Sequence, residues 1–214
     1  YGIIRGSGTN QDGQTSGITV PSALAQSQLQ TAIYQKAGIS IRDLQYIETH
    51  GTATKLGDPM EIQALDQTFA QTFGQTFDQL GNTGTHRPSC AIGSLKANIG
   101  HTSAAAGVLG LIKVLLCLKH RQLPPLINFN TPNEHIDFDK SCLYVNTALK
   151  AWPQNANGTR LAAVSSFGYS GTNAHMVVEQ AMQPSFPETN EPSLIVLPAK
   201  DPERLREYAA QLLD

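Results

Sequence analysis

The sequence predicts an α/β fold built in layers, and three observations lead to that prediction. Short apolar runs typical of strands alternate along the chain with longer segments whose apolar residues recur at helical spacing. A polar, glycine-containing loop follows each of several such strands. Hydrophobic residues make up 40% of the 214 residues, so the chain can bury a substantial core.

The first elements are predicted as a strand, a polar loop and a helix. Ile3 and Ile4 open the strand, and the loop GSGTNQDGQTSG begins at Gly6 because its glycine, asparagine and aspartate residues favour turns. Pro21 is expected at the first helical position. Gly38 follows the last apolar turn and predicts the end of this helix.

A second strand, loop and helix follow in LQYIETHGTATKLGDPMEIQAL. Tyr46 and Ile47 predict the strand. Asp58 as N-cap, with Glu61 three residues later, matches a capping box at the start of the helix. The repeat QTFAQTFGQTFD then predicts a helical extension that frays at Gly74.

The third unit contains the buried strand CAIGS, which follows the loop GNTGTHRPS, and then a helix from about 103 to 119. We predict this helix to be a core helix, because Lys113 interrupts its apolar run and the run is too short to span about 30 Å of hydrocarbon. Residues 121–160 read as a connector with short strand pieces such as LYVN.

The C-terminal part predicts two strands, a linker and a further strand and helix. Leu161–Ser166 and Ala174–Glu179 are the strands, joined by a glycine-bearing turn. The linker AMQPSFPETNEP precedes the strand SLIVL and a helix capped by Asp201.

These elements predict a domain over 1–181, a linker over 182–192 and the start of a second domain over 193–214. The chain begins at Tyr1 within a predicted strand, so we expect a fragment of a longer protein.

Composition argues against several classes of partner. The formal net charge is −2, and no cluster of Lys and Arg is present, so nucleic acid and anionic membranes are not expected partners. Cys90, Cys117 and Cys142 lack CxxC spacing, which favours a reducing, cytoplasmic location over a disulfide framework. No metal site is expected, because no carboxylate or cysteine stands at ligand spacing from His50 or His101.

Three polar loops contain the candidate functional residues: 50–54, 96–101 and 167–175. Sites in layered α/β folds form where loops leave strand ends, so we hypothesise that the three converge. Two neutral histidines, His50 and His101, could donate two N–H bonds to one developing oxyanion. The alternatives are backbone hydrogen bonds within turns for the histidines and a solvated surface charge for Lys96, while His175 is predicted to be structural.

Three stretches in series resemble one family. They are IETHGTATKLGDPMEIQAL, CAIGSLKANIGHTSAAAGVLGLIKVLLCLKHRQLPP and VSSFGYSGTNAHMVVEQA, and they resemble the β-ketoacyl synthase (ketosynthase) domains of modular type I polyketide synthases over about residues 1–180. The ending SLIVLPAKDPERLREYAAQLLD resembles the start of the subdomain that flanks such ketosynthases. The segments NEHIDF and GTNAHMVVE resemble those of synthases whose acyltransferase acts in trans. The resemblance implies the C-terminal half of a thiolase-like αβαβα fold, in which two similar halves pack face to face.

The resemblance implies a decarboxylative Claisen condensation. His50 and His101 match the histidines that bind the thioester oxygen of a malonyl extender as it loses CO2, and Lys96 matches a lysine that orders the His101 network. Thr52 and Thr54 match threonines that contact the phosphopantetheine arm of the acyl carrier protein. No cofactor bound directly by the chain is implied.

The resemblance also assigns the acyl side of the site. Phe167 lies in the turn beside the acyl pocket, where Tyr169 matches the gate and its backbone N–H serves the oxyanion hole. No cysteine of this chain matches the family nucleophile, which is expected in an absent N-terminal half. The expected partners are that half, the acyl carrier protein and a second copy in a homodimer, and the chain alone is predicted to be inactive.

One departure and two alternatives remain open. Fatty-acid synthases of this class carry a glutamate fourteen residues after the lysine, where this chain has Gly110, so the charge partner of Lys96 is open. The alternatives to an elongating synthase are a ketosynthase that only passes acyl chains onward and a non-catalytic scaffold for carrier docking or dimer contacts.

Overall fold

The structure is a computed structural model that describes the chain except residues 18, 74–89, 182–195 and 213–214. The chain divides into two compact units, 1–182 and 183–214. The predicted boundary at residue 181 stays a prediction.

The larger unit is built on one six-stranded sheet with the order β1-β8-β7-β2-β3-β5. The strands are β1 (Gly2–Gln11), β2 (Leu44–Glu48), β3 (Cys90–Gly93), β5 (Leu143–Val145), β7 (Leu161–Phe167) and β8 (Thr172–Gln180). The neighbours β7, β2, β3 and β5 are parallel, whereas β8 is antiparallel to both β7 and β1. The parallel part is covered on both faces, as parallel sheets usually are.

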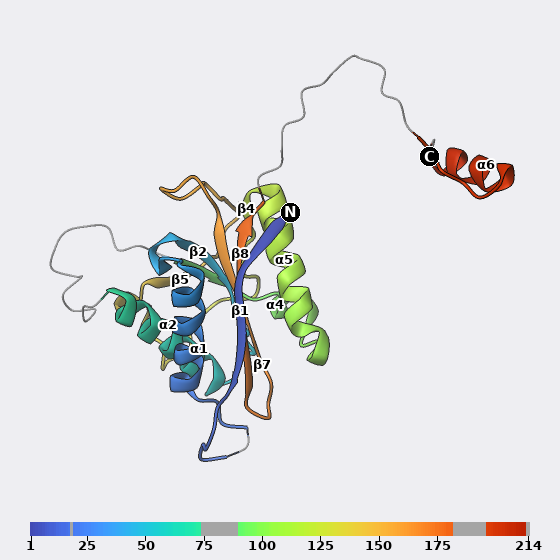
Figure 1. Cartoon of the computed structure of the whole chain (residues 1–214). Coiled ribbons are helices and arrows are strands. Elements are labelled where there is room, and N and C mark those ends of the chain that lie inside the picture. Colours follow the sequence, from blue (N-terminus) through green and yellow to red (C-terminus); the bar gives the residue numbers. More distant parts are fainter. Residues whose placement is uncertain (18, 74–89, 182–195, 213–214) are drawn as a thin grey trace. The chain divides into compact units, whose positions relative to one another are not determined.

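Helices cover the two faces of this sheet (Figure 1). On one face, α1 (Ala23–Ala37) and α2 (Gly57–Phe73) contribute Leu29, Leu65 and Phe69 to a core with the sheet. On the other, α5 (Ala106–His120) contributes Val114 and Leu118 to a second core that includes Trp152. This helix, sheet and helix arrangement confirms the layered α/β prediction.

Several short elements lie between these. They are α4 (Lys96–Ile99), 3-10 turns at Ile41–Asp43, Ser103–Ala105 and Phe138–Lys140, and the antiparallel pair β4 (Gln122–Leu123) and β6 (Lys150–Ala151). The connector predicted over 121–160 therefore also contributes β5 to the main sheet.

Two N-terminal predictions were wrong. The strand β1 continues to Gln11, which pairs with Thr172, so the loop does not begin at Gly6. Pairing along the whole length of β8 outweighs the local turn preference of this segment. Helix α1 is capped by the hydroxyl of Ser22, and Pro21 lies before the cap. The predicted end is confirmed, since Gly38 is the left-handed C-cap.

The predicted capping box of α2 was also wrong. The helix begins at Gly57, whose N–H donates to the Thr54 hydroxyl at 3.0 Å. The Asp58 carboxylate instead accepts from the Ala53 N–H at 3.1 Å, and Glu61 reaches the loop after β2. Helix α2 ends at Phe73, and the predicted fraying at Gly74 and the loop GNTGTHRPS lie outside the described residues.

Helix α5 is only in part the core helix that was predicted. A 3-10 turn precedes it, and its own residues begin at Ala106. Val114 and Leu118 are buried, but Val108 and Ile112 are 54% and 46% exposed. One face of α5 therefore packs on β7 and β8 while the opposite face is open.

The apolar run that was predicted to be too short for a membrane lies within a longer helical segment. In the part of the chain that the structure describes, Ser103–His120 is the one helical segment long and apolar enough to cross a membrane. Core helices of soluble proteins pass the same test, and α5 packs against the sheet.

The smaller unit contains α6 (Pro202–Gln211). The side chain of Asp201 accepts from the Arg204 N–H at 2.9 Å, which confirms the predicted cap. The predicted strand SLIVL is not formed at Val196 and Leu197, and its first three residues lie outside the described ranges.

Candidate active site

The three polar loops leave the same edge of the sheet. His50 follows β2, the segment 94–105 follows β3, and Phe167 is the last residue of β7. These strands are parallel neighbours, with Glu48 opposite both Gly93 and Val164, so their carboxyl ends lie together. The sequence hypothesis that the three loops converge is confirmed by the contacts between them.

His50 is the centre of these contacts. Its ring centroid lies 5.4 Å from that of His101, with the two rings nearly perpendicular at 81°. The Phe167 ring centroid is also 5.4 Å away, and the Phe167 N–H donates to His50 Nδ1 at 3.3 Å. Residues from three loops therefore meet within one small region.

The hydrogen bonds to the two rings define their tautomers. The Phe167 N–H donates to Nδ1 of His50, and the Ser103 N–H donates to Nδ1 of His101 at 3.0 Å. A ring nitrogen that accepts a hydrogen bond carries no proton, so the proton of each neutral imidazole is on Nε2. Both histidines are thus arranged as Nε2–H donors.

Burial keeps His50 neutral. Burial is the largest cause, and together with the nearby charges of Lys96 and then His101 it lowers the pKa of His50 to about 4. The His50 ring is consequently uncharged at neutral pH, and it can donate a hydrogen bond without itself introducing a cation. His101 lies in a more exposed position on the neighbouring loop.

The loop that holds His50 depends on Glu61 of α2. The Glu61 carboxylate accepts from the backbone N–H groups of His50, at 2.8 Å, and Gly51, at 2.9 Å. Burial raises the pKa of Glu61 to about 7, although these two hydrogen bonds act in the opposite direction. Gly51 has φ +45°, and a Cβ there would lie 2.8 Å from the Thr49 hydroxyl, so the turn requires glycine.

Lys96 is half-buried at the start of α4, which disfavours its interpretation as a solvated surface charge. Burial lowers its pKa, and the charges of Glu61, Glu48 and Asp58 oppose that shift. In the described ranges Lys96 forms no ion pair, so its charge is balanced by carboxylates that are not in direct contact.

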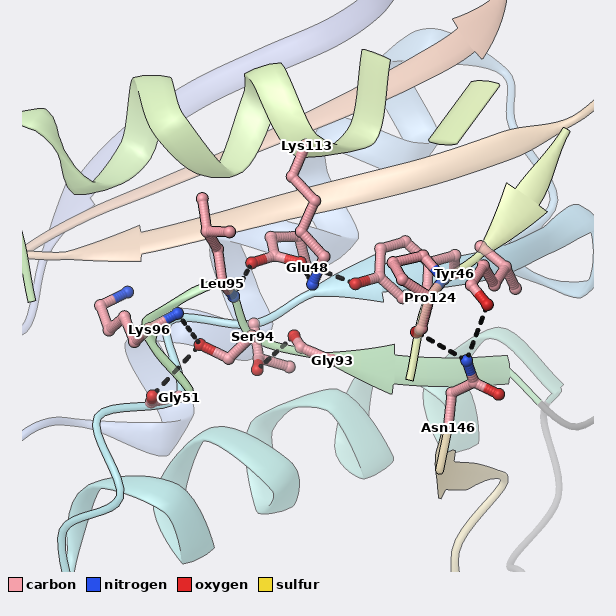
Figure 2. A network of polar contacts seen from close by, with 12 residues as sticks. Tyr46, Glu48, Gly51, Gly93, Ser94, Leu95, Lys96, Lys113, Pro124 and Asn146 are labelled. Carbon is pink, nitrogen blue, oxygen red and sulfur yellow. Dashed lines mark hydrogen bonds and ion pairs between the residues drawn. The ribbon is translucent and has the colours of Figure 1, made fainter. Parts of the chain in front are cut away.

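Ser94 connects the loop of Lys96 to that of His50. Its hydroxyl accepts from the Lys96 N–H at 3.4 Å and donates to the Gly51 carbonyl at 3.3 Å (Figure 2). Sequence reasoning missed Ser94 and the role of Glu61, because both act through backbone atoms of other loops.

The remaining predicted site residues line a cleft of about 1060 Å³. Its lining includes His50, His101, Thr52, Thr54, Phe167 and Tyr169. The hydroxyls of Thr52 and Thr54 lie 3.3 Å apart, and Tyr169 is 81% exposed. A neighbouring cavity of about 610 Å³ is lined in part by Lys96, Thr52 and His101. Each of the seven predicted site residues thus lines the cleft or the neighbouring cavity, and Thr52 and His101 line both.

The cysteines lie away from the cleft. Cys90, Cys117 and Cys142 are all buried and form no disulfide among the described residues, and none of them lines the cleft. Burial raises the pKa of Cys117 to about 11 and that of Cys90 further, so neither thiol is activated. Within the described ranges, no group of three or more His, Cys, Asp or Glu side chains could hold a metal ion.

Comparison with known families identifies the class of protein to which this fold belongs. Residues 1–130 match the family described as "Beta-ketoacyl synthase, C-terminal domain", and residues 132–214 match "Ketoacyl-synthetase C-terminal extension". The chain belongs to the β-ketoacyl synthase family.

The relatives are polyketide synthases. The chain is 49% identical over 219 residues to polyketide synthase PksL of Bacillus subtilis, covering all of this chain and 5% of that protein. It is 39% identical to erythronolide synthase EryA3 of Saccharopolyspora erythraea, covering 99% of this chain and 6% of that protein.

Solved structures of ketosynthases also resemble this chain. The ketosynthase from module 6 of the Bacillus subtilis bacillaene synthase superposes with a TM-score of 0.77 at 51% identity, covering 98% of this chain and 34% of that one. The chain therefore has the fold of a ketosynthase C-terminal part and spans about a third of a solved ketosynthase.

Proposed function

We propose that this chain supplies the decarboxylation half of an elongating ketosynthase site. The observation that carries the proposal is that His50 and His101 each accept a backbone N–H at Nδ1, which leaves Nε2–H as the donor, and that their rings lie 5.4 Å apart at one cleft. A thioester oxygen bound by both would be stabilised as it gains negative charge.

The thioester oxygen takes up the negative charge that decarboxylation produces. The bond between the malonyl carboxylate and C2 breaks, CO2 leaves, and its electron pair enters an enolate whose oxygen accepts from both histidines. The enolate carbon then attacks the carbonyl of an acyl group held as a cysteine thioester. A carbon–carbon bond forms and the thiolate leaves.

The nucleophilic cysteine is proposed to lie in polypeptide outside these residues. Two observations support this: the chain spans 34% of a solved ketosynthase, and its own cysteines are buried, with raised pKa values for Cys90 and Cys117. The open faces of α5 and of the cleft at His101 would pack against that polypeptide. Separated from it, the chain is expected to be inactive.

The roles of the other site residues are proposed from the resemblance of the motifs to the family. Thr52 and Thr54 line the cleft, where their hydroxyls could contact the phosphopantetheine arm of an acyl carrier protein. Lys96 would order the segment that carries His101, and Tyr169 at the cleft rim would gate the acyl pocket. A cytoplasmic, homodimeric synthase, of the type whose acyltransferase acts in trans, completes the proposal.

The experiment uses the complete ketosynthase that contains this chain and compares His50→Ala with His120→Ala. His120 is an exposed histidine at the end of α5 and serves as the matched control. Acylation of the protein is followed by intact mass, and CO2 release from malonyl carrier protein is followed separately. We expect His50→Ala to retain acylation and to lose CO2 release by about 10²- to 10³-fold, with His120→Ala unchanged.

Each alternative predicts a different result. A ketosynthase that only passes acyl chains onward would be acylated but release no CO2 even without substitution. A scaffold would show neither reaction. Specific acylation of Cys90, Cys117 or Cys142 would contradict the assignment of the nucleophile to other polypeptide.

A further inference from the structure

Glu48 is a buried carboxylate that the proposed reaction does not use. It is the last residue of β2, two positions before His50, and only 3% of it is exposed. A carboxylate buried to this extent must be paired and hydrogen-bonded. Its partners therefore indicate what it does.

Three groups contact the Glu48 carboxylate (Figure 2). The Tyr46 hydroxyl donates to Oε2 at 2.6 Å, and Lys113 Nζ of α5 lies 2.7 Å from the same oxygen. The other oxygen, Oε1, accepts from the Leu95 N–H at 2.5 Å. The countercharge and the backbone donor are thus on opposite oxygens.

The contact with Leu95 joins two parts of the site. Leu95 is the N-cap of α4 and directly precedes Lys96. Glu48 therefore fixes the start of the segment that leads to His101, while it belongs to the strand that leads to His50. A charge-assisted hydrogen bond to a backbone N–H is short and directional, and it suits such positioning.

Helix α5 leaves room for this carboxylate. A Cβ at Gly110 would lie 3.2 Å from Glu48 Cγ and 3.4 Å from Val164 Cγ1. Any side chain at position 110 would compete with Glu48 for this space. The glycine and the glutamate thus form one complementary arrangement between helix and strand.

We propose that Glu48 is a positioning residue that holds the Leu95 N–H, and thereby sets the Lys96–His101 segment against His50, with Lys113 as its countercharge. The inference rests on the proposed function, since the segment matters only if the two histidines share a substrate oxygen. It acts through backbone geometry and involves no contact with substrate.

The first test separates the hydrogen bond from the ion pair. In the complete ketosynthase, Glu48→Gln/Lys113→Met and Glu48→Met/Lys113→Met both remove the charges, but only the glutamine retains an acceptor for the Leu95 N–H. We expect the glutamine variant to keep the turnover number for CO2 release within about threefold of the unsubstituted enzyme. The methionine variant should lose about tenfold or more, with acylation of the nucleophile preserved.

A second pair tests the donor without touching the buried charges. Leu95 has φ −64°, which proline adopts, so Leu95→Pro removes the N–H. Leu95→Ala keeps the N–H and controls for the lost side chain. Leu95→Pro should lose CO2 release by about tenfold, and Leu95→Ala should stay within about threefold. This pair decides the question if the methionine variant does not fold.

The outcomes distinguish this inference from the proposed function. Equal CO2 release within each pair, or a parallel loss of acylation and CO2 release, would overturn the role of Glu48 while leaving the histidine site intact. Absence of CO2 release from the unsubstituted, acylated enzyme would instead overturn the proposed function.

Discussion

His175 and the pair of His50 and His101 are held in contrasting ways. His175 lies within β8 at 2% exposure, hydrogen-bonded through Nε2 to the Tyr34 hydroxyl at 2.8 Å and through Nδ1 to the Ser165 hydroxyl at 3.0 Å. His50 and His101 each use Nδ1 to accept from a backbone N–H. Among the described residues, no hydrogen bond engages their Nε2 atoms.

The difference separates a structural histidine from one available to a ligand. Both ring nitrogens of His175 are satisfied inside the protein, so it can contribute only to stability. His50 and His101 are each oriented through Nδ1, and both residues line the cleft. The pairing of each ring nitrogen, more than burial alone, therefore indicates which histidines can act on a substrate.

The largest effect expected from this contrast is on stability. His175→Ala leaves the buried hydroxyls of Tyr34 and Ser165 without their partner and should lower the free energy of unfolding by about 3 kcal/mol. His101→Ala, at an exposed position, should change it by no more than about 0.5 kcal/mol. Urea unfolding of the complete ketosynthase measures both, and equal losses would remove the distinction.

A second effect is expected in the pH dependence of stability. Burial lowers the pKa of His175 to about 3 from 6.5. The unfolded chain therefore binds a proton below about pH 6.5 that the folded chain excludes until about pH 3, so this group destabilises the fold as pH falls through that window. Its slope is at most about 1.4 kcal/mol per pH unit.

The measurement compares unfolding free energies of the unsubstituted ketosynthase and His175→Gln from pH 7 to pH 4. Glutamine does not titrate, so the variant should lose less stability on acidification and the gap between the two proteins should narrow. A gap that stays constant over this range would contradict burial of a neutral His175.

Local patterns predicted the strands and the site loops, since each carries its own signal. The apolar runs at β2, β3 and β7 and the histidine, glycine and threonine residues after β2 are visible in sequence, and so is the structural assignment of His175. The parallel order β7-β2-β3 then brings the loops together. The roles of the site residues were predicted from the resemblance of the motifs to a family, because the spacing of the residues alone does not indicate them.

The predictions from sequence were wrong where tertiary contacts outweigh the local structural preference of a segment. Glu61 matches a capping box in sequence, yet it satisfies the N–H groups of His50 and Gly51 in the folded chain. Likewise, Glu48 fills the space beside Gly110, and its ion-pair partner is Lys113 of α5. Neither contact has a local pattern, because the partners are distant along the chain or are backbone atoms.

The most direct test of the central claim uses side chains that imitate one ring nitrogen at a time. The amide nitrogen of Gln can occupy the place of Nε2, whereas that of Asn reaches only the place of Nδ1. If His101 donates through Nε2, CO2 release by the complete ketosynthase should remain within about tenfold for His101→Gln. His101→Asn should fall with His101→Ala, about 100-fold or more below the unsubstituted enzyme. An asparagine variant that equals or exceeds the glutamine variant would contradict the Nε2–H assignment.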